Sequence, residues 1–309
     1  MKPINNCTRF VLIVCCLFLY NQEVNGSATP VADSSEIVLA GEQLQLVGDG
    51  FAFTEGPAAD RDGNVYFTDQ PNNRIWKYDL QGKLSIFMEN AGRANGLYFD
   101  KEGALIACAD EQNQLWRIEN GVVEKLVRHY QDTLLNGPND VWVAPNGFIY
   151  FTDPYYQRDY WKRKAPDLKV QALYLYKKDG HLVRLDDRFK RPNGIVGTPD
   201  GHYLYVADIG DDKTYRYTLK KNGKLAKKRL FIHKGSDGMT IDTQGNLYLT
   251  GKGVTVYDKQ GKEIAHISVP TKWTANVCFG GRDGNILFIT ASDKVFTLKM
   301  RTKGYSKKR

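Results

Sequence analysis

The sequence has few of the residues from which zinc fingers, disulfide scaffolds and serine hydrolases are built. Of its five cysteines, only Cys108 and Cys278 lie beyond the N-terminal segment. Each falls in an apolar, strand-like stretch, so we expect two buried thiols rather than a disulfide. The chain has no Cys-x-x-Cys pair, no Cys/His cluster and no Gly-x-Ser-x-Gly elbow. These absences argue against a zinc finger and against a serine hydrolase.

No membrane span is predicted either. The apolar run Phe10–Tyr20 is too short to be a stable anchor, and it follows basic residues and precedes small ones near Gly26. This order is typical of a secretory signal peptide, which we place at residues 1–28. The sequence therefore predicts export, to the periplasm or to the medium.

There is no excess of acidic residues. The 43 Lys and Arg outnumber the 35 Asp and Glu, which gives a formal net charge of +8. Basic residues gather at 220–229 and in the tail, 301–309, without the interleaved aromatic residues of a nucleic-acid-binding surface. We interpret them as solvated side chains and expect no nucleic-acid partner.

What the sequence contains instead is one phrase repeated six times. Each copy has a polar residue, a short strand, a glycine-containing turn and a second strand. The leading polar residues are Glu55, Asn95, Asn139, Asn193, Asp237 and Asn276, spaced by 40, 44, 54, 44 and 39 residues. This period predicts an all-β, six-bladed β-propeller with four-stranded antiparallel blades. We place it at residues 29–303, followed by a short basic tail, 304–309.

Two segments depart from the repeat. The last repeat has only three predicted strands, so the strand-like segment Glu36–Val47 is predicted to supply the fourth and close the ring. The alternative is an N-terminal extension that packs elsewhere. The third repeat is the longest, because residues 155–171 are added after its second strand, and they are rich in aromatic and cationic side chains. This loop either covers the mouth of a pocket or packs on itself.

The six leading residues are expected to meet in a ring, since the innermost strands of a propeller all start at the same end of the central channel. Carboxylates and amide carbonyls form an oxygen-ligand set that suits Ca²⁺, Mg²⁺ or Mn²⁺. Alternatively, Asn and Asp only cap strand corners, where they are common. Glu55 favours a metal, because Glu is a poor turn residue. Four aspartates that end second strands are instead interpreted as corner hydrogen-bond acceptors: Asp69, Asp110, Asp153 and Asp208.

Several of these phrases resemble the senescence-marker-protein/gluconolactonase family. They are Glu55-Gly56-Pro57, Pro138-Asn139-Asp140, Pro192-Asn193-Gly194 and Ser236-Asp237-Gly238-Met239, and the resemblance extends over residues 37–303. It implies a six-bladed propeller with one divalent metal in the channel, commonly calcium or zinc, and hydrolysis of sugar lactones or related esters.

The resemblance also implies roles for individual residues. The family's metal ligands correspond to Glu55, Asn193 and Asp237, and its proton donor or general base corresponds to Asp237. Asn139 corresponds to a position that either joins the metal ligands or contacts substrate. We further expect Asp140 to orient the ligands, and we expect substrate contacts from Asn95, Asn139, Asn276, Tyr155 and Trp273. Animal members carry Arg at the position of Gly137, so substrate contacts of that Arg do not transfer to this chain.

The sequence thus predicts an exported, metal-dependent lactonase that acts on a small lactone or ester, with Ca²⁺ the first expectation and Zn²⁺, Mg²⁺ or Mn²⁺ as alternatives. A phosphotriesterase or fluorophosphatase, or another ester hydrolase, could use the same ring. A non-catalytic binding propeller is the alternative from a different class, although it would not need Glu55 and Asp237 to face each other.

Overall fold

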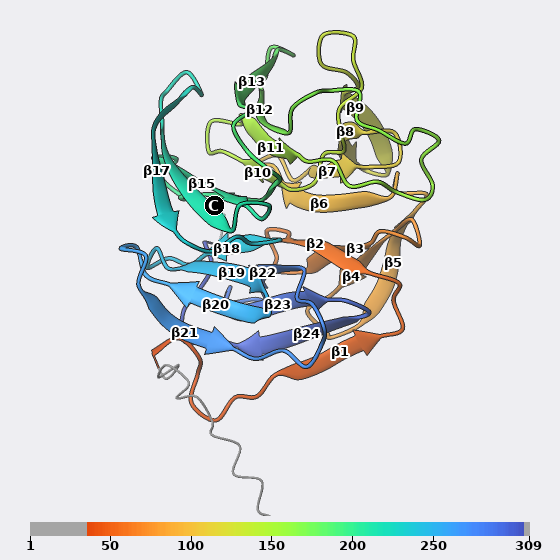
Figure 1. Cartoon of the computed structure of the whole chain (residues 1–309). Coiled ribbons are helices and arrows are strands. Elements are labelled where there is room, and N and C mark those ends of the chain that lie inside the picture. Colours follow the sequence, from red (N-terminus) through yellow and green to blue (C-terminus); the bar gives the residue numbers. More distant parts are fainter. Residues whose placement is uncertain (1–35, 306–309) are drawn as a thin grey trace, which may run out of the picture. The chain divides into compact units, whose positions relative to one another are not determined.

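The computed structural model describes residues 36–305, in which 24 strands form six four-stranded antiparallel sheets (Figure 1). The signal peptide predicted at 1–28 and the end of the basic tail lie outside these residues. The sheets are, in chain order, β2–β5 (Thr54–Ala59, Val65–Asp69, Arg74–Tyr78, Leu84–Glu89), β6–β9 (Ala94–Phe99, Leu105–Ala109, Gln114–Glu119, Val122–Val127), β10–β13 (Val141–Val143, Ile149–Asp153, Ala172–Tyr176, Leu182–Asp186), β14–β17 (Pro192–Gly197, Tyr203–Asp208, Lys213–Leu219, Leu225–Ile232), β18–β21 (Met239–Ile241, Leu247–Gly251, Gly253–Tyr257, Glu263–Ile267) and β22–β24 with β1 (Asn276–Gly280, Ile286–Ala291, Lys294–Lys299, Gln45–Asp49).

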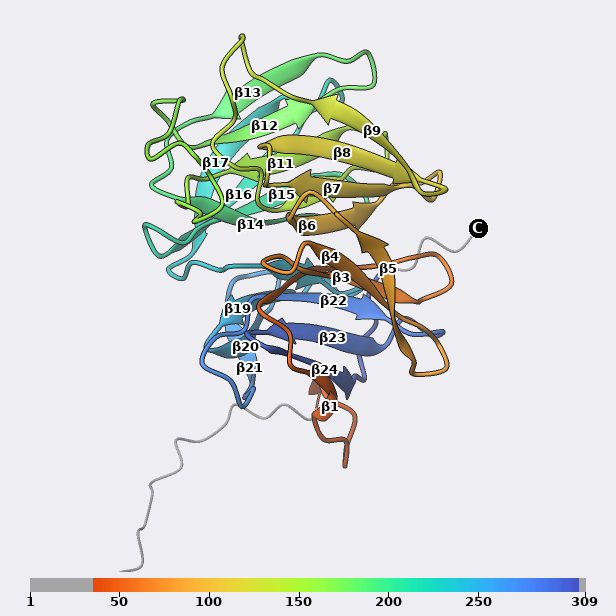
Figure 2. The same ribbon diagram turned by 90° about the vertical axis from the view of Figure 1, so that its right-hand side faces the viewer.

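The innermost strands close into a ring. Strand β2 contacts β6, and the series continues through β10, β14, β18 and β22, which in turn contacts β2. The predicted six-bladed propeller is therefore confirmed. Figure 2 shows the strands of the second blade following one another outward from β6 to β9.

Tight hairpins join the first two strands of each blade. All six glycines predicted in these turns have a positive φ, between 68° and 99°: Gly63, Gly103, Gly147, Gly201, Gly245 and Gly284. A residue without Cβ adopts this conformation without steric cost, so the turn residues specify the hairpins.

Large side chains fill the space between neighbouring sheets. Three of them, Tyr150, Tyr217 and Tyr248, are almost completely buried. The hydroxyl of Tyr150 donates a hydrogen bond to the Gly223 carbonyl, that of Tyr217 donates to Asp186, and that of Tyr248 donates to Asp242. A buried tyrosine thus contributes apolar area without leaving its hydroxyl unpaired. The thiols of Cys108 and Cys278 are both buried and free, as predicted.

The N-terminal segment closes the sixth blade. Strand β1 pairs antiparallel with β24, Gln45 opposite Thr297 and Asp49 opposite Lys294, and the two lie side by side in both views (Figures 1 and 2). The predicted closing strand is confirmed, but it begins later than its apolar pattern indicated. A turn at Gly41, with φ of 82°, separates it from an isolated bridge between Val38 and Met300.

We predict that deleting residues 36–49 strongly destabilises the propeller, because β24 then becomes an open edge. Loss of the backbone pairing of one strand costs about 4 kcal/mol, which corresponds to a fall in Tm of about 10 °C. Calorimetry of this variant beside one lacking residues 306–309 measures the effect. An unchanged Tm in the first variant would show that β1 does not close the ring.

Candidate active site

The six leading residues of the repeats come to one end of the channel, as predicted. Glu55, Asn95, Asn193 and Asn276 lie at the start of β2, β6, β14 and β22, and the other two directly precede β10 and β18. Five of the six are buried, with 2–5% of their surface exposed, whereas Asp237 is partly exposed. Asp237, the residue that the sequence assigns to proton transfer, is therefore the least buried of the six.

Glycine after the leading residue allows this close approach. Four of the six are followed by Gly56, Gly96, Gly194 and Gly238. A Cβ on Gly238 would lie 1.9 Å from Cγ of Asn276, and one on Gly194 would lie 2.9 Å from the carbonyl oxygen of Asp237. At these glycine positions, a side chain would therefore collide with the leading residue of the next blade.

Asp140 occupies a position where four other blades have this glycine. Its Oδ1 accepts a hydrogen bond from the Val141 amide (3.0 Å), and its Oδ2 accepts one from the Ile195 amide in the next blade (3.3 Å). Burial raises the pKa of Asp140 to about 7. The two hydrogen bonds from backbone amides oppose this rise, whereas the negative charge of Asp237 increases it. The predicted orienting residue is therefore fixed to the backbone and electrostatically coupled to the ring.

Negative charge is concentrated at this end of the channel. Burial, followed by the carboxylate of Asp237, raises the pKa of Glu55 well above its usual value. Burial also raises the pKa of Asp237 to about 6, although hydrogen bonds from Trp273 and Asn193 hold it down. The two acids of the ring thus interact electrostatically, and a cation would stabilise both in the ionised form.

Hydrogen bonds fix both oxygens of Asp237. The indole Nε1 of Trp273 donates to Oδ2 at 2.6 Å, and Nδ2 of Asn193 donates to Oδ1 at 2.8 Å. The same Asn193 nitrogen lies 3.0 Å from the hydroxyl of Tyr156. Because the nitrogen of Asn193 is engaged in this way, its carbonyl oxygen is the atom available to a ligand.

The remaining amides of the ring differ in their contacts. Oδ1 of Asn276 accepts a hydrogen bond from the Val277 amide at 2.8 Å. Within residues 36–305, the side chains of Asn95 and Asn139 have no hydrogen-bond partner. Their buried amides are thus the ones left to contact a bound molecule.

The loop over residues 155–171 contacts the ring, but through residues that the sequence did not single out. The hydroxyl of Tyr155 donates to Gln157, and its ring lies 5.9 Å from that of Trp161, within the loop. Tyr156 reaches Asn193 instead, and Arg158 lies in the same loop. The aromatic and cationic composition of the loop was the available signal, and it could not say which of two adjacent tyrosines points inward.

The aspartates that end second strands form blade corners, with one exception. Asp69, Asp153 and Asp208 each accept hydrogen bonds from two successive backbone amides, at 2.8 to 3.2 Å. The prediction is confirmed for these three. The carboxylate of Asp110 accepts hydrogen bonds from side chains instead, namely those of Gln70, Arg158 and Tyr160.

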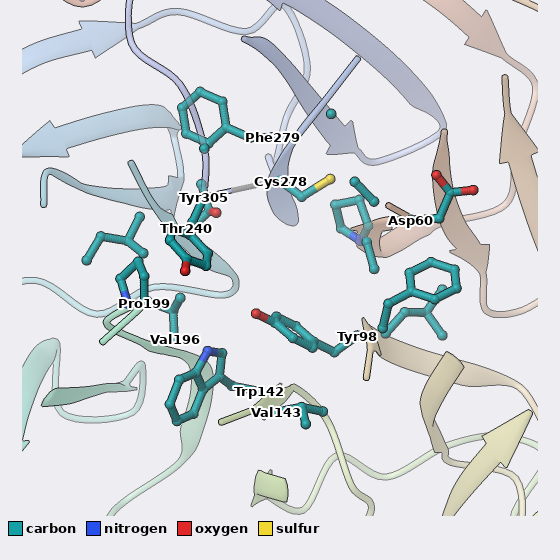
Figure 3. A pocket seen from close by; sticks show the side chains of 18 of the residues that line it. Asp60, Tyr98, Trp142, Val143, Val196, Pro199, Thr240, Cys278, Phe279 and Tyr305 are labelled. Atoms are coloured by element: carbon teal, nitrogen blue, oxygen red, sulfur yellow. The ribbon is translucent and has the colours of Figure 1, made fainter. Parts of the chain in front are cut away.

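A cavity of about 690 Å³ occupies the other end of the channel. It opens beside the hairpins that join the first two strands of the blades. Figure 3 shows the rings of Tyr98 and Tyr305 directed into it, with Trp142 and Cys278 on its wall. Asp140 and Asn276 line it as well, so these two residues separate the cavity from the acidic ring.

The ring suits a hard divalent cation only if amides join the carboxylates. Within the described part of the chain, no group of three or more His, Cys, Asp or Glu side chains is arranged to hold a metal by itself. The available donors are the carboxylates of Glu55 and Asp237 and the carbonyl oxygen of Asn193. Buried oxygen donors with unrelieved negative charge fit Ca²⁺ or a similar ion, with water completing its coordination.

None of the residues 36–305 belongs to a helix long and apolar enough to cross a membrane.

Comparison with known proteins identifies the family. The model of the SMP-30/gluconolactonase/LRE-like region matches residues 53–293. The chain belongs to this family.

A gluconolactonase of Zymomonas mobilis is 27% identical over 293 residues, which cover 84% of this chain and 82% of that protein. A diisopropyl-fluorophosphatase of Loligo vulgaris is 25% identical over 229 residues, 64% of this chain and 72% of that one. The solved structure of a gluconolactonase of Xanthomonas campestris has a TM-score of 0.80 at 26% identity, covering 87% of this chain and 93% of that chain.

Proposed function

We propose that this chain is a metal-dependent hydrolase that opens a sugar lactone. The observation that carries the proposal is the pair of acids, Glu55 and Asp237, held together beside Asn193 at one end of the channel. A scaffold without chemistry would gain nothing from this arrangement, since burying two interacting carboxylates costs stability. The family and the gluconolactonase relatives support the same reaction class.

Glu55, Asn193 and Asp237 would hold the cation, and Asn139 would either join them or contact the substrate. Ca²⁺ suits this donor set best, and Zn²⁺, Mg²⁺ and Mn²⁺ are the alternatives. When bound, a divalent cation supplies Lewis acidity, which polarises the lactone carbonyl.

Asp237 handles the proton in this proposal. Its two oxygens are oriented by Trp273 and Asn193, and it is the least buried member of the ring. Its carboxylate can accept a proton from the attacking water and return it to the alkoxide that leaves when the ester bond breaks.

Hydrolysis of a phosphorus ester is the second candidate. The same oriented carboxylate of Asp237 could act as a nucleophile on phosphorus, and the diisopropyl-fluorophosphatase relative supports this reading. Lactones and organophosphates therefore belong in the same assay.

We predict that the protein, after treatment with chelator, hydrolyses sugar lactones only when a divalent cation is added back. The measurement is pH-stat hydrolysis of glucono-δ-lactone, δ-valerolactone, an aryl ester and a dialkyl fluorophosphate, each with Ca²⁺, Zn²⁺, Mg²⁺ or Mn²⁺. Restored activity on the sugar lactone supports the proposal, and activity only on the fluorophosphate supports the second candidate. Hydrolysis of none of them with any cation would favour a binding propeller.

A further inference from the structure

The carboxylate of Asp110 has different hydrogen-bond partners from the aspartates at the equivalent position of other blades. In blades one, three and four the equivalent aspartate caps two backbone amides, whereas the Arg93 amide at the corner of blade two donates to Asn73 instead. The Asp110 carboxylate is almost fully buried, and its Oδ2 accepts from Nε of Arg158 at 2.8 Å and from the Tyr160 hydroxyl at 2.7 Å. The corner of blade two has thus become the anchor of a loop that belongs to blade three.

The anchor also involves the backbone of Asp110. The indole Nε1 of Trp161 donates to its carbonyl oxygen at 2.9 Å, and the indole is 95% buried. Three contacts, from Arg158, Tyr160 and Trp161, therefore hold the loop across the boundary between blades two and three. This geometry fixes where the guanidinium of Arg158 lies.

The anchor needs the glycine at position 137. A Cβ there would lie 2.6 Å from Oδ1 of Asp110 and 3.0 Å from the Trp161 ring. A long side chain at this position is incompatible with the anchored loop. The Arg that animal members carry here, and which this chain lacks, is therefore excluded by the same contacts that bring Arg158 in.

A series of contacts links Arg158 to the acidic ring of the channel. Its guanidinium lies 5.6 Å from the centre of the phenol group of Tyr156, and the hydroxyl of Tyr156 contacts Nδ2 of Asn193. The same Asn193 nitrogen donates a hydrogen bond to Oδ1 of Asp237 at 2.8 Å. Tyr156 and Asn193 therefore connect the guanidinium to the carboxylate of Asp237.

Only part of this guanidinium is used by the protein. Nε is bonded to Asp110, whereas Nη1 and Nη2 have no hydrogen-bond partner among residues 36–305. The side chain is 24% exposed, so these two nitrogens reach solvent beside the ring. A guanidinium held by one edge with its other donors open is arranged to bind oxygen atoms of a ligand.

We propose that Arg158 is a specificity-determining residue, whose Nη1 and Nη2 bind hydroxyl oxygens of a polyhydroxylated lactone at the ring, and hydroxyl or carboxylate oxygens of the sugar acid that hydrolysis releases. The inference rests on the proposed lactonase function and deepens it. It predicts selection of sugar-derived lactones over lactones that carry no hydroxyl groups, with the Asp110 anchor as the device that positions the guanidinium.

The test compares two lactones in Arg158→Met. For glucono-δ-lactone we expect a rise in KM, and a fall in kcat/KM of about 10- to 100-fold, the effect of losing hydrogen bonds from a charged donor. For δ-valerolactone, which has no hydroxyl groups, kcat/KM should stay within about threefold of wild type. Equal losses on both lactones would overturn the inference.

Arg163→Met is the matched control. Arg163 lies in the same loop, stacks on Trp161 at 4.3 Å and donates to the Leu135 carbonyl, away from the ring. It should leave the preference between the two lactones unchanged. If it shifts the preference as far as Arg158→Met does, the effect belongs to loop integrity and the inference is wrong.

A binding measurement separates this inference from the proposed reaction. Calorimetric titration with gluconate, in the presence of Ca²⁺, does not require turnover. If wild type hydrolyses neither lactone, the proposed function fails, and the role of Arg158 still stands when gluconate binds wild type at least tenfold more tightly than Arg158→Met. Equal binding by the two proteins, or no binding by wild type, overturns it.

Discussion

Asp237→Asn should abolish most of the lactonase activity while leaving the propeller folded. The amide is nearly isosteric and can still accept the hydrogen bond that Trp273 donates at 2.6 Å. It cannot accept a proton, and it removes one negative charge from the proposed cation site. Loss of a group that transfers protons costs on the order of 10³-fold in kcat/KM. Steady-state kinetics on glucono-δ-lactone at saturating cation measures this loss.

Stability distinguishes a role in the reaction from a role in the fold. The charge of Asp237 raises the pKa of Glu55, after the larger effect of burial, so the two carboxylates repel each other. Without cation, Asp237→Asn should therefore have a Tm equal to or above that of wild type at pH 8. A lower Tm would indicate that this carboxylate supports the fold.

Asp69→Asn is the matched control. Asp69 lies at the same rim, is as buried as the ring, and accepts hydrogen bonds from the Ala52 and Phe53 amides. Its replacement should lower Tm by a few degrees and leave kcat/KM of the folded enzyme within about threefold of wild type. Retention of activity in Asp237→Asn, or an equal loss in Asp69→Asn, would contradict the assignment.

The propeller could be predicted because its determinants are local and repeated. A glycine at each hairpin allows a positive φ without steric cost, and β-branched and aromatic residues with period two form the strands on either side. The ring follows from topology alone, since equivalent positions of equivalent blades must meet at the channel. Glu55, Asn193 and Asp237 could therefore be placed together although they lie far apart in the sequence.

The contacts of the loop over residues 155–171 could not be predicted, because they depend on a contact between different blades. Asp110 has the same sequence context as the three corner aspartates, yet it binds Arg158. The difference arises from Gly137, whose missing side chain leaves space for Trp161. Nor does the repeat pattern show that a cavity of about 690 Å³ lies at the opposite end of the channel from the ring. It depends on how side chains such as Tyr98 and Tyr305 fill that end.

Addition of Ca²⁺ should raise Tm strongly at pH 8 and little at pH 5. Burial raises the pKa of Asp237 to about 6, and that of Glu55 is raised as well, whereas both groups ionise near pH 4 in an unfolded chain. Between these values the folded protein binds more protons than the unfolded chain, so the stability of the cation-free protein falls as pH rises from about 4 to beyond 6. A cation reverses this loss, because it binds the ionised carboxylates.

The size of the shift follows from mass action. Ca²⁺ at a hundred times its Kd stabilises the fold by about 2.7 kcal/mol, which raises Tm by about 5 to 10 °C. Scanning calorimetry at pH 5, 6, 7 and 8, with chelator or with Ca²⁺ at matched ionic strength, measures the shift.

In Glu55→Gln the cation-free protein should be more stable than wild type at pH 8, and the shift should be lost. A shift that is the same at pH 5 and pH 8, or that survives in Glu55→Gln, would mean that the cation binds elsewhere. The function of the two acids of the ring would then have to be the binding of another ligand.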